Sequence, residues 1–217
     1  MSIMEILEIN IPLSNVTLKG NLVIPKNAIG IVIFSHGSGS SRFSPRNNYV
    51  AKMFHRSNIG TLLFDLLTEE EDEIYENRFN IDLLVSRLIE VTEWLMKNEN
   101  TKGYPFAYFG ASTGAASALR AAAYFGNTIK AVVSRGGRPD LGLSALALVT
   151  APTLLIVGQM DVPVVIMNKQ AYDEINTIKE MKTIPGATHL FEEPGALQEV
   201  AESAIDWYKK YFNNKME

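Results

Sequence analysis

The alternation of short apolar runs with amphipathic helical segments is the feature that most constrains how this 217-residue chain folds. Continuous apolar runs such as Ile29–Ser35 and Thr153–Gly158 are typical of strands buried on both faces of a sheet. Strands that alternate with helices favour a mostly parallel sheet with helices on both faces. We therefore expect one α/β domain that spans residues 1–217.

The pattern also predicts where the elements lie. The expected strands are Ile3–Ile11, Val16–Ile24, Ile29–Ser35, Gly60–Leu67, Phe106–Phe109, Ile129–Ser134, Thr153–Gly158 and Glu180–Ile184. Ser14-Asn15 between the first two favours an initial hairpin. The expected helices are Pro45–Ser57, Ile81–Lys97, Thr113–Phe125, Val165–Ile175 and Leu197–Phe212. We interpret the acidic segment Glu69–Glu76 as a solvated loop without the spacing of a metal site.

Composition removes several classes of function. The chain has no cysteine, which excludes disulfides, thiolate metal sites and a cysteine nucleophile. Its net charge of −4 disfavours a nucleic-acid partner. No apolar run is long enough to cross a membrane, and Met1–Leu13 contains two glutamates and does not resemble a targeting signal. These features predict a soluble, cytoplasmic protein whose partner is a small molecule.

The segment Gly110-Ala111-Ser112-Thr113-Gly114 matches the pattern G-x-S-x-G between an expected strand and an expected helix. In this setting a serine stands on a sharp turn, so that its hydroxyl is clear of the sheet. Glycines flank it because side chains at Gly110 and Gly114 would collide with neighbouring backbone. The pattern therefore predicts that Ser112 is a nucleophile.

A serine nucleophile needs a base, and the chain has three histidines. His189 lies after the last expected strand and fits the chain order Ser, Asp, His of this architecture. His55 lies in an expected helix, and His36 begins a glycine-rich loop where we expect a structural role. Asp161, directly after the strand Thr153–Gly158, is the favoured acid. Asp140 is the alternative.

Two backbone N–H groups are expected to form the oxyanion hole. One is that of Thr113, directly after the nucleophile, and the other is that of Ser38 in the loop after Ile29–Ser35. The same loop, Gly37-Ser38-Gly39, is a weak match to a dinucleotide-binding motif because Arg42 stands where a third glycine is needed.

Arginines gather after the expected strands, where ligands bind in open α/β sheets. They are Arg42, Arg46, Arg135 and Arg138. We consider Arg42, Arg135 and Arg138 as candidates to bind a carboxylate or phosphate on the substrate. The alternative is that the arginines pair with Asp140, Glu192 or Glu193 and hold loops in place.

Five segments in this order, SHGSGSSR, FGASTGAA, SRGGRPDL, LLIVGQMD and PGATHLFEEPG, resemble the α/β-hydrolase superfamily. More narrowly they resemble its dienelactone-hydrolase-like branch, which includes hydrolase domains that occur beside phosphoribosyltransferase domains. The resemblance implies an eight-stranded, mostly parallel sheet and the triad Ser112, Asp161 and His189. True dienelactone hydrolases use a cysteine nucleophile, so we do not expect dienelactone itself as the substrate. We see no phosphoribosyltransferase segment and do not expect that activity.

Together these observations predict a carboxylesterase-like serine hydrolase that acts through an acyl-enzyme on a small ester, thioester or lactone. The substrate is expected to carry an anionic group. No metal or organic cofactor is expected, and the protein is expected as a monomer or homodimer. Only the short segment Arg135–Ala151 is available to roof the site, which favours small substrates. The alternatives are a non-catalytic binding protein of the same fold, a small serine peptidase and an acyltransferase.

Overall fold

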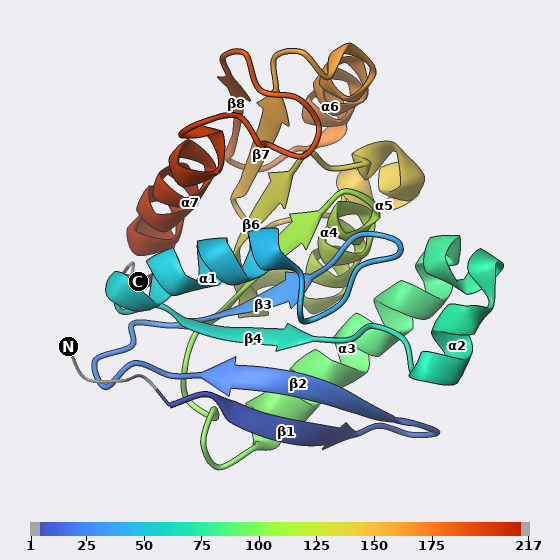
Figure 1. Ribbon diagram of the computed structural model, residues 1–217, viewed down its shortest axis with the longest axis vertical. Coiled ribbons are helices and arrows are strands. Elements are labelled where there is room, and N and C mark those ends of the chain that lie inside the picture. Colours follow the sequence, from blue (N-terminus) through green and yellow to red (C-terminus); the bar gives the residue numbers. More distant parts are fainter. Residues whose placement is uncertain (1–4, 214–217) are drawn as a thin grey trace.

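Eight strands form one sheet in the order β1-β2-β4-β3-β5-β6-β7-β8 in this computed structural model, which describes residues 5–213 (Figure 1). β3 to β8 run parallel to one another, and β2 runs antiparallel to both of its neighbours. The strands are β1 (Leu7–Pro12), β2 (Thr17–Val23), β3 (Ile31–Ser35), β4 (Gly60–Phe64), β5 (Phe106–Ala111), β6 (Ile129–Arg135), β7 (Thr153–Gly158) and β8 (Lys179–Ile184). This architecture confirms the expected α/β fold.

β1 and β2 form the expected hairpin, with Pro12 opposite Thr17 next to the turn. The start of its first predicted strand, at Ile3, lies outside the described residues. The hairpin continues the sheet because Val23 of β2 pairs with Thr61 of β4.

The main helices cover both faces of the sheet (Figure 1). They are α1 (Pro45–Arg56), α3 (Ile81–Lys97), α4 (Thr113–Phe125), α6 (Val162–Glu174) and α7 (Ala196–Phe212). Neighbouring residues of β5 show how the two layers are made, because side chains alternate between the faces of a strand. The Tyr108 hydroxyl lies 2.8 Å from Thr92 Oγ1 of α3, whereas the Phe109 ring packs 5.9 Å from Phe54 of α1.

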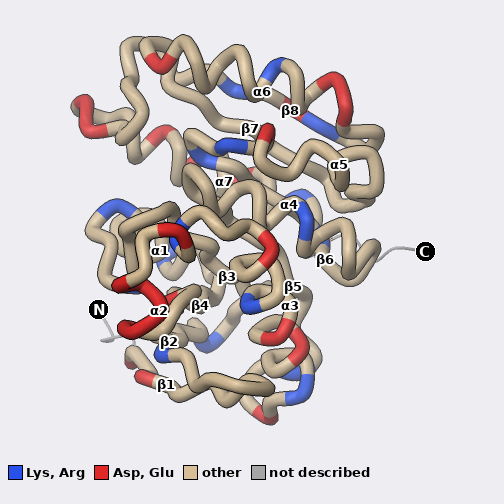
Figure 2. Tube along the Cα trace, turned by 90° about the vertical axis from the view of Figure 1, so that its right-hand side faces the viewer, with Lys and Arg blue, Asp and Glu red and all other residues tan. Residues whose placement is uncertain are grey.

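The acidic segment after β4 is not the loop that we expected. Glu69–Glu73 form the short helix α2, and Tyr75–Phe79 form the 3-10 helix η1. Figure 2 shows the run of acidic residues along α2. A capping box starts this helix, because the Thr68 hydroxyl accepts the N–H of Glu71 while the Glu71 carboxylate accepts the N–H of Thr68. Negative charge in a first helical turn is also stabilising. The spacing Thr68-x-x-Glu71 is typical of a helix start, and the prediction of a loop did not take it into account.

Other differences are small and lie at element ends. β5 and β6 reach Ala111 and Arg135, one or two residues beyond the predicted ends, and carry the sheet up to the turn at Ser112. α6 begins at Val162 rather than Val165, because Asp161 is its N-cap and proline stands in its first turn. β4 ends at Phe64 although the apolar run continues to Leu67.

The segment between β6 and β7 is short, as the sequence predicts. It contains the 3-10 helix η3 (Pro139–Gly142) and the one-turn helix α5 (Leu143–Leu146). The 3-10 helix η2 (Gly126–Thr128) joins α4 to β6. Within residues 5–213, no helix has the length and apolar character needed to cross a bilayer.

Candidate active site

Ser112 occupies the sharp turn between β5 and α4, with φ 52° and ψ −122°. A residue with a side chain adopts positive φ only at a cost, and such strain concentrates at functional sites. The neighbouring glycines allow the turn. A side chain on Gly110 would lie 2.5 Å from the Cα of Ala115, and one on Gly114 would overlap the carbonyl oxygen of Ser35. The collisions expected from the sequence are therefore present.

The Ser112 hydroxyl does not cap the helix that it precedes. Serine at an N-cap normally accepts a hydrogen bond from the first turn. Ser44 does this at α1, where its hydroxyl accepts the N–H of Asn47. Ser112 is the N-cap of α4 but makes no such bond. Its hydroxyl is available for chemistry.

Asp161 and His189 are hydrogen-bonded side chains at the carboxyl ends of neighbouring strands. Asp161 follows β7 and His189 follows β8, and the distance from Asp161 Oδ2 to His189 Nδ1 is 2.6 Å. The alternative acid, Asp140, binds Arg138 through two hydrogen bonds of 2.9 and 2.8 Å. The structure therefore brings Asp161, rather than Asp140, to the histidine.

Backbone contacts bring the loops of Ser112 and His189 to the same edge of the sheet. The N–H of Ser112 donates to the carbonyl oxygen of Arg135, at 3.2 Å. The next residue, Gly136, packs against His189, where a side chain would lie 3.6 Å from His189 Cε1. Gly136 also has φ 52°. Only glycine combines this backbone conformation with the close approach of the histidine ring.

The two expected oxyanion donors lie next to each other, and a contact between them was not foreseen. The N–H of Ser38 donates to the side-chain Oγ1 of Thr113, at 2.8 Å. Gly37, before Ser38, packs against Ser112, where a side chain would lie 3.1 Å from Ser112 Cβ. The loop after β3 therefore borders Ser112. The sequence pattern predicts a role for the backbone N–H of Thr113 but none for its hydroxyl.

His36 has the structural role expected for it. Its Nε2 accepts the N–H of Leu66, at 3.1 Å, and its Nδ1 lies 2.9 Å from the carbonyl oxygen of Gly37. Burial lowers the pKa of His36, against the smaller opposing effect of the Gly37 carbonyl. A neutral ring that donates from Nδ1 and accepts at Nε2 satisfies both contacts. His36 thereby links the loop of Ser38 to the segment after β4.

His55 lies away from this edge, on α1. Its Nε2 is 2.7 Å from Thr61 Oγ1 in β4. Burial, assisted by the charge of Lys52, lowers the pKa of His55 to about 4.

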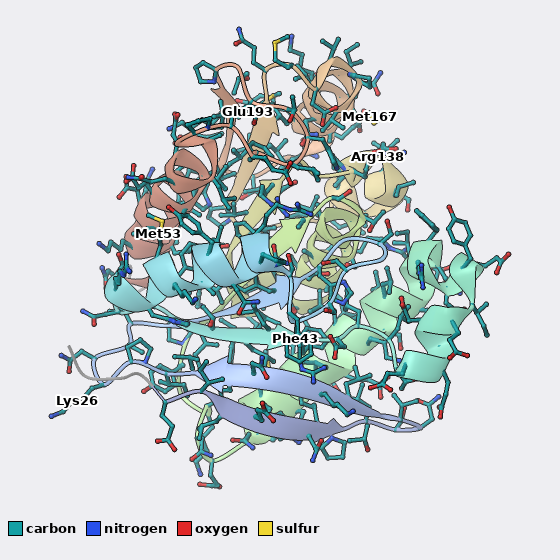
Figure 3. The ribbon with its side chains drawn as sticks, in the orientation of Figure 1. Lys26, Phe43, Met53, Arg138, Met167 and Glu193 are labelled. Atoms are coloured by element: carbon teal, nitrogen blue, oxygen red, sulfur yellow. The ribbon has the colours of Figure 1, made fainter. Side chains whose placement is uncertain are left out.

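Three of the four arginines that follow the strands form ion pairs with carboxylates of the same or neighbouring loops. Arg42 pairs with Asp65, Arg46 with Glu192 at 2.9 Å, and Arg138 with Asp140. These pairs agree with the alternative in which arginines fix loops. Arg138 and Glu193, on the loops that follow β6 and β8, are labelled in Figure 3. Arg135 differs from the others because it is buried and no carboxylate among residues 5–213 forms an ion pair with it.

A cavity of about 610 Å³ lies away from the proposed triad, next to the segment that follows Ser38. It is bordered by the start of β2, the segment Ser40–Phe43 and α2. Its volume is in the range of small-molecule sites. Ser112, Asp161 and His189 do not line it. In the described part of the chain, no group of three histidine, aspartate or glutamate side chains is arranged to hold a metal ion.

Comparison with known proteins gives one decisive match. The crystal structure of dienelactone hydrolase from Anabaena variabilis is 53% identical in sequence and superposes with a TM-score of 0.93, covering 96% of this chain and 98% of that one. This chain belongs to the dienelactone-hydrolase-like family of α/β-hydrolases. No protein-family profile matches it.

More distant members of the α/β-hydrolase fold share the architecture alone. Est1E from Butyrivibrio proteoclasticus has a TM-score of 0.82 at 16% identity, covering 95% of this chain and 99% of that one. An esterase from Pyrococcus furiosus has a TM-score of 0.80 at 18% identity, covering 97% of this chain and 92% of that one.

Curated relatives of this dienelactone-hydrolase-like chain occur in two strains of Mycobacterium tuberculosis. Both are 51% identical over 201 residues and carry provisional names as phosphoribosyl transferases. The alignment covers 93% of this chain but 45% of each relative. The chain thus spans less than half the length of the proteins to which those names were given.

Proposed function

We propose that this protein is a serine hydrolase that cleaves a small carboxylic ester, or the related thioester or lactone, through an acyl-enzyme. The observation that carries the proposal is a strained serine with an uncommitted hydroxyl at the sheet edge where a hydrogen-bonded Asp161–His189 pair also lies. Membership of a hydrolase family supports the same class of reaction.

The reaction has two acyl-transfer steps. His189 takes the hydroxyl proton of Ser112 as the serine oxygen attacks the carbonyl carbon, and it then gives this proton to the leaving group. His189 next takes a proton from water as the water oxygen attacks the acyl carbon, and returns it to Ser112 as the acid leaves. Asp161 holds the imidazole by its Nδ1–H and stabilises the imidazolium that forms in each step.

The negative charge on the carbonyl oxygen is stabilised by the N–H groups of Thr113 and Ser38. The Thr113 N–H lies in the first turn of α4, where the helix dipole favours negative charge. Before substrate binds, the Thr113 hydroxyl accepts the Ser38 N–H and so acts as a positioning group that holds it beside Ser112. In the transition state the same N–H is shared with the oxyanion. The short η3–α5 segment is consistent with small substrates.

Labelling with a fluorophosphonate probe tests this proposal. We expect the folded protein to take up one label at Ser112 and to hydrolyse a 4-nitrophenyl ester. Ser112→Ala should abolish both signals. The control Ser203→Ala removes a hydroxyl from helix α7 and should retain them. Absence of labelling in the folded wild-type protein would rule out a serine hydrolase.

A further inference from the structure

Arg135 places a charged side chain where the strand pattern calls for an apolar one. It ends β6, pairs with Ala111 across the sheet, and follows Ala131 and Val133 on the face covered by α1 and α7. Its exposed fraction is 7%. Its backbone carbonyl accepts the N–H of Ser112, so the backbone of Arg135 lies directly beside the proposed nucleophile.

The guanidinium has little to compensate its burial. Among the described residues its one hydrogen bond runs from Nη2 to Asn47 Oδ1 and is long, at 3.4 Å. Its Nε is buried without a partner, and the ring of Phe191 lies 5.9 Å from its Cζ. A buried charge without a counter-charge is costly.

The same chain shows how a buried arginine is otherwise accommodated. Arg87 has an exposed fraction of 3%, and its guanidinium lies 2.6 Å from Glu71 and 3.8 Å from Glu90. It also donates to Asn15 Oδ1, at 2.9 Å. Within residues 5–213, Arg135 has no such carboxylate. The Nε of Arg87 is also buried without a partner, so the missing carboxylate is what sets Arg135 apart and calls for a counter-charge from outside the described residues.

A second arginine lies next to the first, because Arg46 adjoins Asn47 in α1 and its partner Glu192 adjoins Phe191, the two residues against which the Arg135 guanidinium lies. Arg46, in the first turn of α1, pairs with Glu192 but keeps a buried Nε without a partner. Burial, and after it the charge of Arg46, lowers the pKa of Arg135 to about 10. Two guanidinium groups that repel each other, each with an unused N–H, offer the donors that an oxyanion accepts.

We propose that Arg135 and Arg46 form a binding site for a carboxylate or phosphate group, between α1 and the loop that carries His189. Asn47 supplies a neutral wall of this site. If the proposed function holds, the anion is part of the substrate and lies on the acyl side of an ester, next to Ser112. Arg42 and Arg138 do not take part, because Asp65 and Asp140 pair with them and neither keeps a buried nitrogen without a partner among residues 5–213. Arg46 pairs with Glu192 but does keep one.

Two esters of similar size test the site through the substrate. One is 4-nitrophenyl hydrogen glutarate, which is anionic, and the other is 4-nitrophenyl valerate, which is neutral. Arg135→Met and Arg46→Gln should each lower kcat/KM for the anionic ester by about 10- to 100-fold, mainly through KM, and change it less than about twofold for the neutral ester. Arg56→Gln, at the exposed end of the same helix α1, is the matched control and should change neither.

Free anions test the site without catalysis, so that it is judged separately from the proposed function. Acetate or phosphate should raise the thermal midpoint of the wild-type protein relative to chloride at equal ionic strength, and should not do so in Arg135→Met or Arg46→Gln. Ester discrimination without this shift supports the site as one for the substrate's own carboxylate. The shift without ester hydrolysis supports an anion site in a protein that is not an esterase.

Two results together overturn the proposal. The first is that each variant changes kcat/KM for the anionic and the neutral ester by the same factor, and the second is that anions shift the thermal midpoint of the wild-type protein and of the variants equally. If Arg135→Met does not fold, Arg46→Gln carries the same test, because Arg46 is half-buried and its loss leaves the sheet intact.

Discussion

The Oδ2 of Asp161 lies 2.6 Å from the Nδ1 of His189, although 28 residues separate them in the sequence. Parallel strands explain this distance. β7 and β8 are neighbours, so the loops that follow them leave the same edge of the sheet. A carboxylate at this distance fixes which ring nitrogen carries the proton and leaves Nε2 free to face a nucleophile.

Asp161→Asn should lower kcat by about 10⁴-fold, because an amide stabilises the wrong tautomer and cannot balance the imidazolium. Asp140→Asn is the matched control, since Asp140 is the other acid of this sheet edge and binds Arg138 instead. Steady-state hydrolysis of a neutral 4-nitrophenyl ester measures both. Equal losses in the two variants would contradict the assignment of Asp161.

Thr113→Val keeps the shape of the side chain but removes the oxygen that accepts the Ser38 N–H. We expect kcat to fall by about 10- to 100-fold with a smaller change in KM, because the loss concerns a donor for the oxyanion rather than substrate binding. Thr113→Ser keeps the oxygen and should restore most of kcat. If valine and serine behave alike, the hydroxyl does not position Ser38.

Gly114→Ala should destabilise the fold by about 3 kcal/mol or more, because the added methyl group would overlap the Ser35 carbonyl and force α4 away from β3. Gly186→Ala separates this collision from backbone strain. Gly186 has φ 68°, but a side chain there meets no atom within 4 Å, so we expect a loss of about 1 kcal/mol. Urea unfolding followed by circular dichroism compares the two. Equal losses would contradict the packing argument.

The pKa values of His36 and His55 predict how stability depends on pH. Burial lowers the pKa of both below the ordinary value of 6.5, to about 4 for His55. The unfolded chain therefore binds more protons below pH 6.5 than the folded protein does, so the stabilisation is complete above pH 6.5 and is lost as the pH falls. Each group contributes at most about 1.4 kcal/mol per pH unit, and His55 contributes less because water partly reaches it.

Unfolding free energies at pH 7.5, 6.5, 5.5 and 5.0 measure this dependence. His55→Asn should make the decline below pH 6.5 shallower. A wild-type unfolding free energy that stays constant from pH 6.5 to pH 5.0 would be incompatible with two histidines buried in the neutral form.

What the sequence predicts well is what depends on neighbours along the chain or on strand ends. The turn at Ser112 follows from Gly110 and Gly114. A side chain on Gly110 would collide with the start of α4, and one on Gly114 would collide with the end of the adjacent strand β3. The approach of Asp161 to His189 follows from the rule that parallel strands end at one edge. The helix α4 follows from its pattern, and its observed bounds equal the predicted ones.

What the sequence predicts poorly depends on the shapes of loops from different strands. Arg42 pairs with Asp65, which follows the neighbouring strand β4, and not with any of the expected partners Asp140, Glu192 and Glu193. The contact from Ser38 to Thr113 joins the ends of β3 and β5 in the same way. α2 was missed for a different reason, since an acidic run looks solvated unless its capping residue, Thr68, is read with it.

The backbone of Ser112 also bears on how such a protein changes under selection. At φ 52° and ψ −122°, any residue with a Cβ costs the fold about 1 to 3 kcal/mol, whereas glycine does not. Ser112→Gly should therefore unfold at higher denaturant concentration than Ser112→Ala, and the difference between the two measures the strain. Selection for stability alone would exchange this serine for glycine. The backbone of this turn thus disfavours serine at position 112, and the proposed reaction is the benefit that would offset this loss of stability.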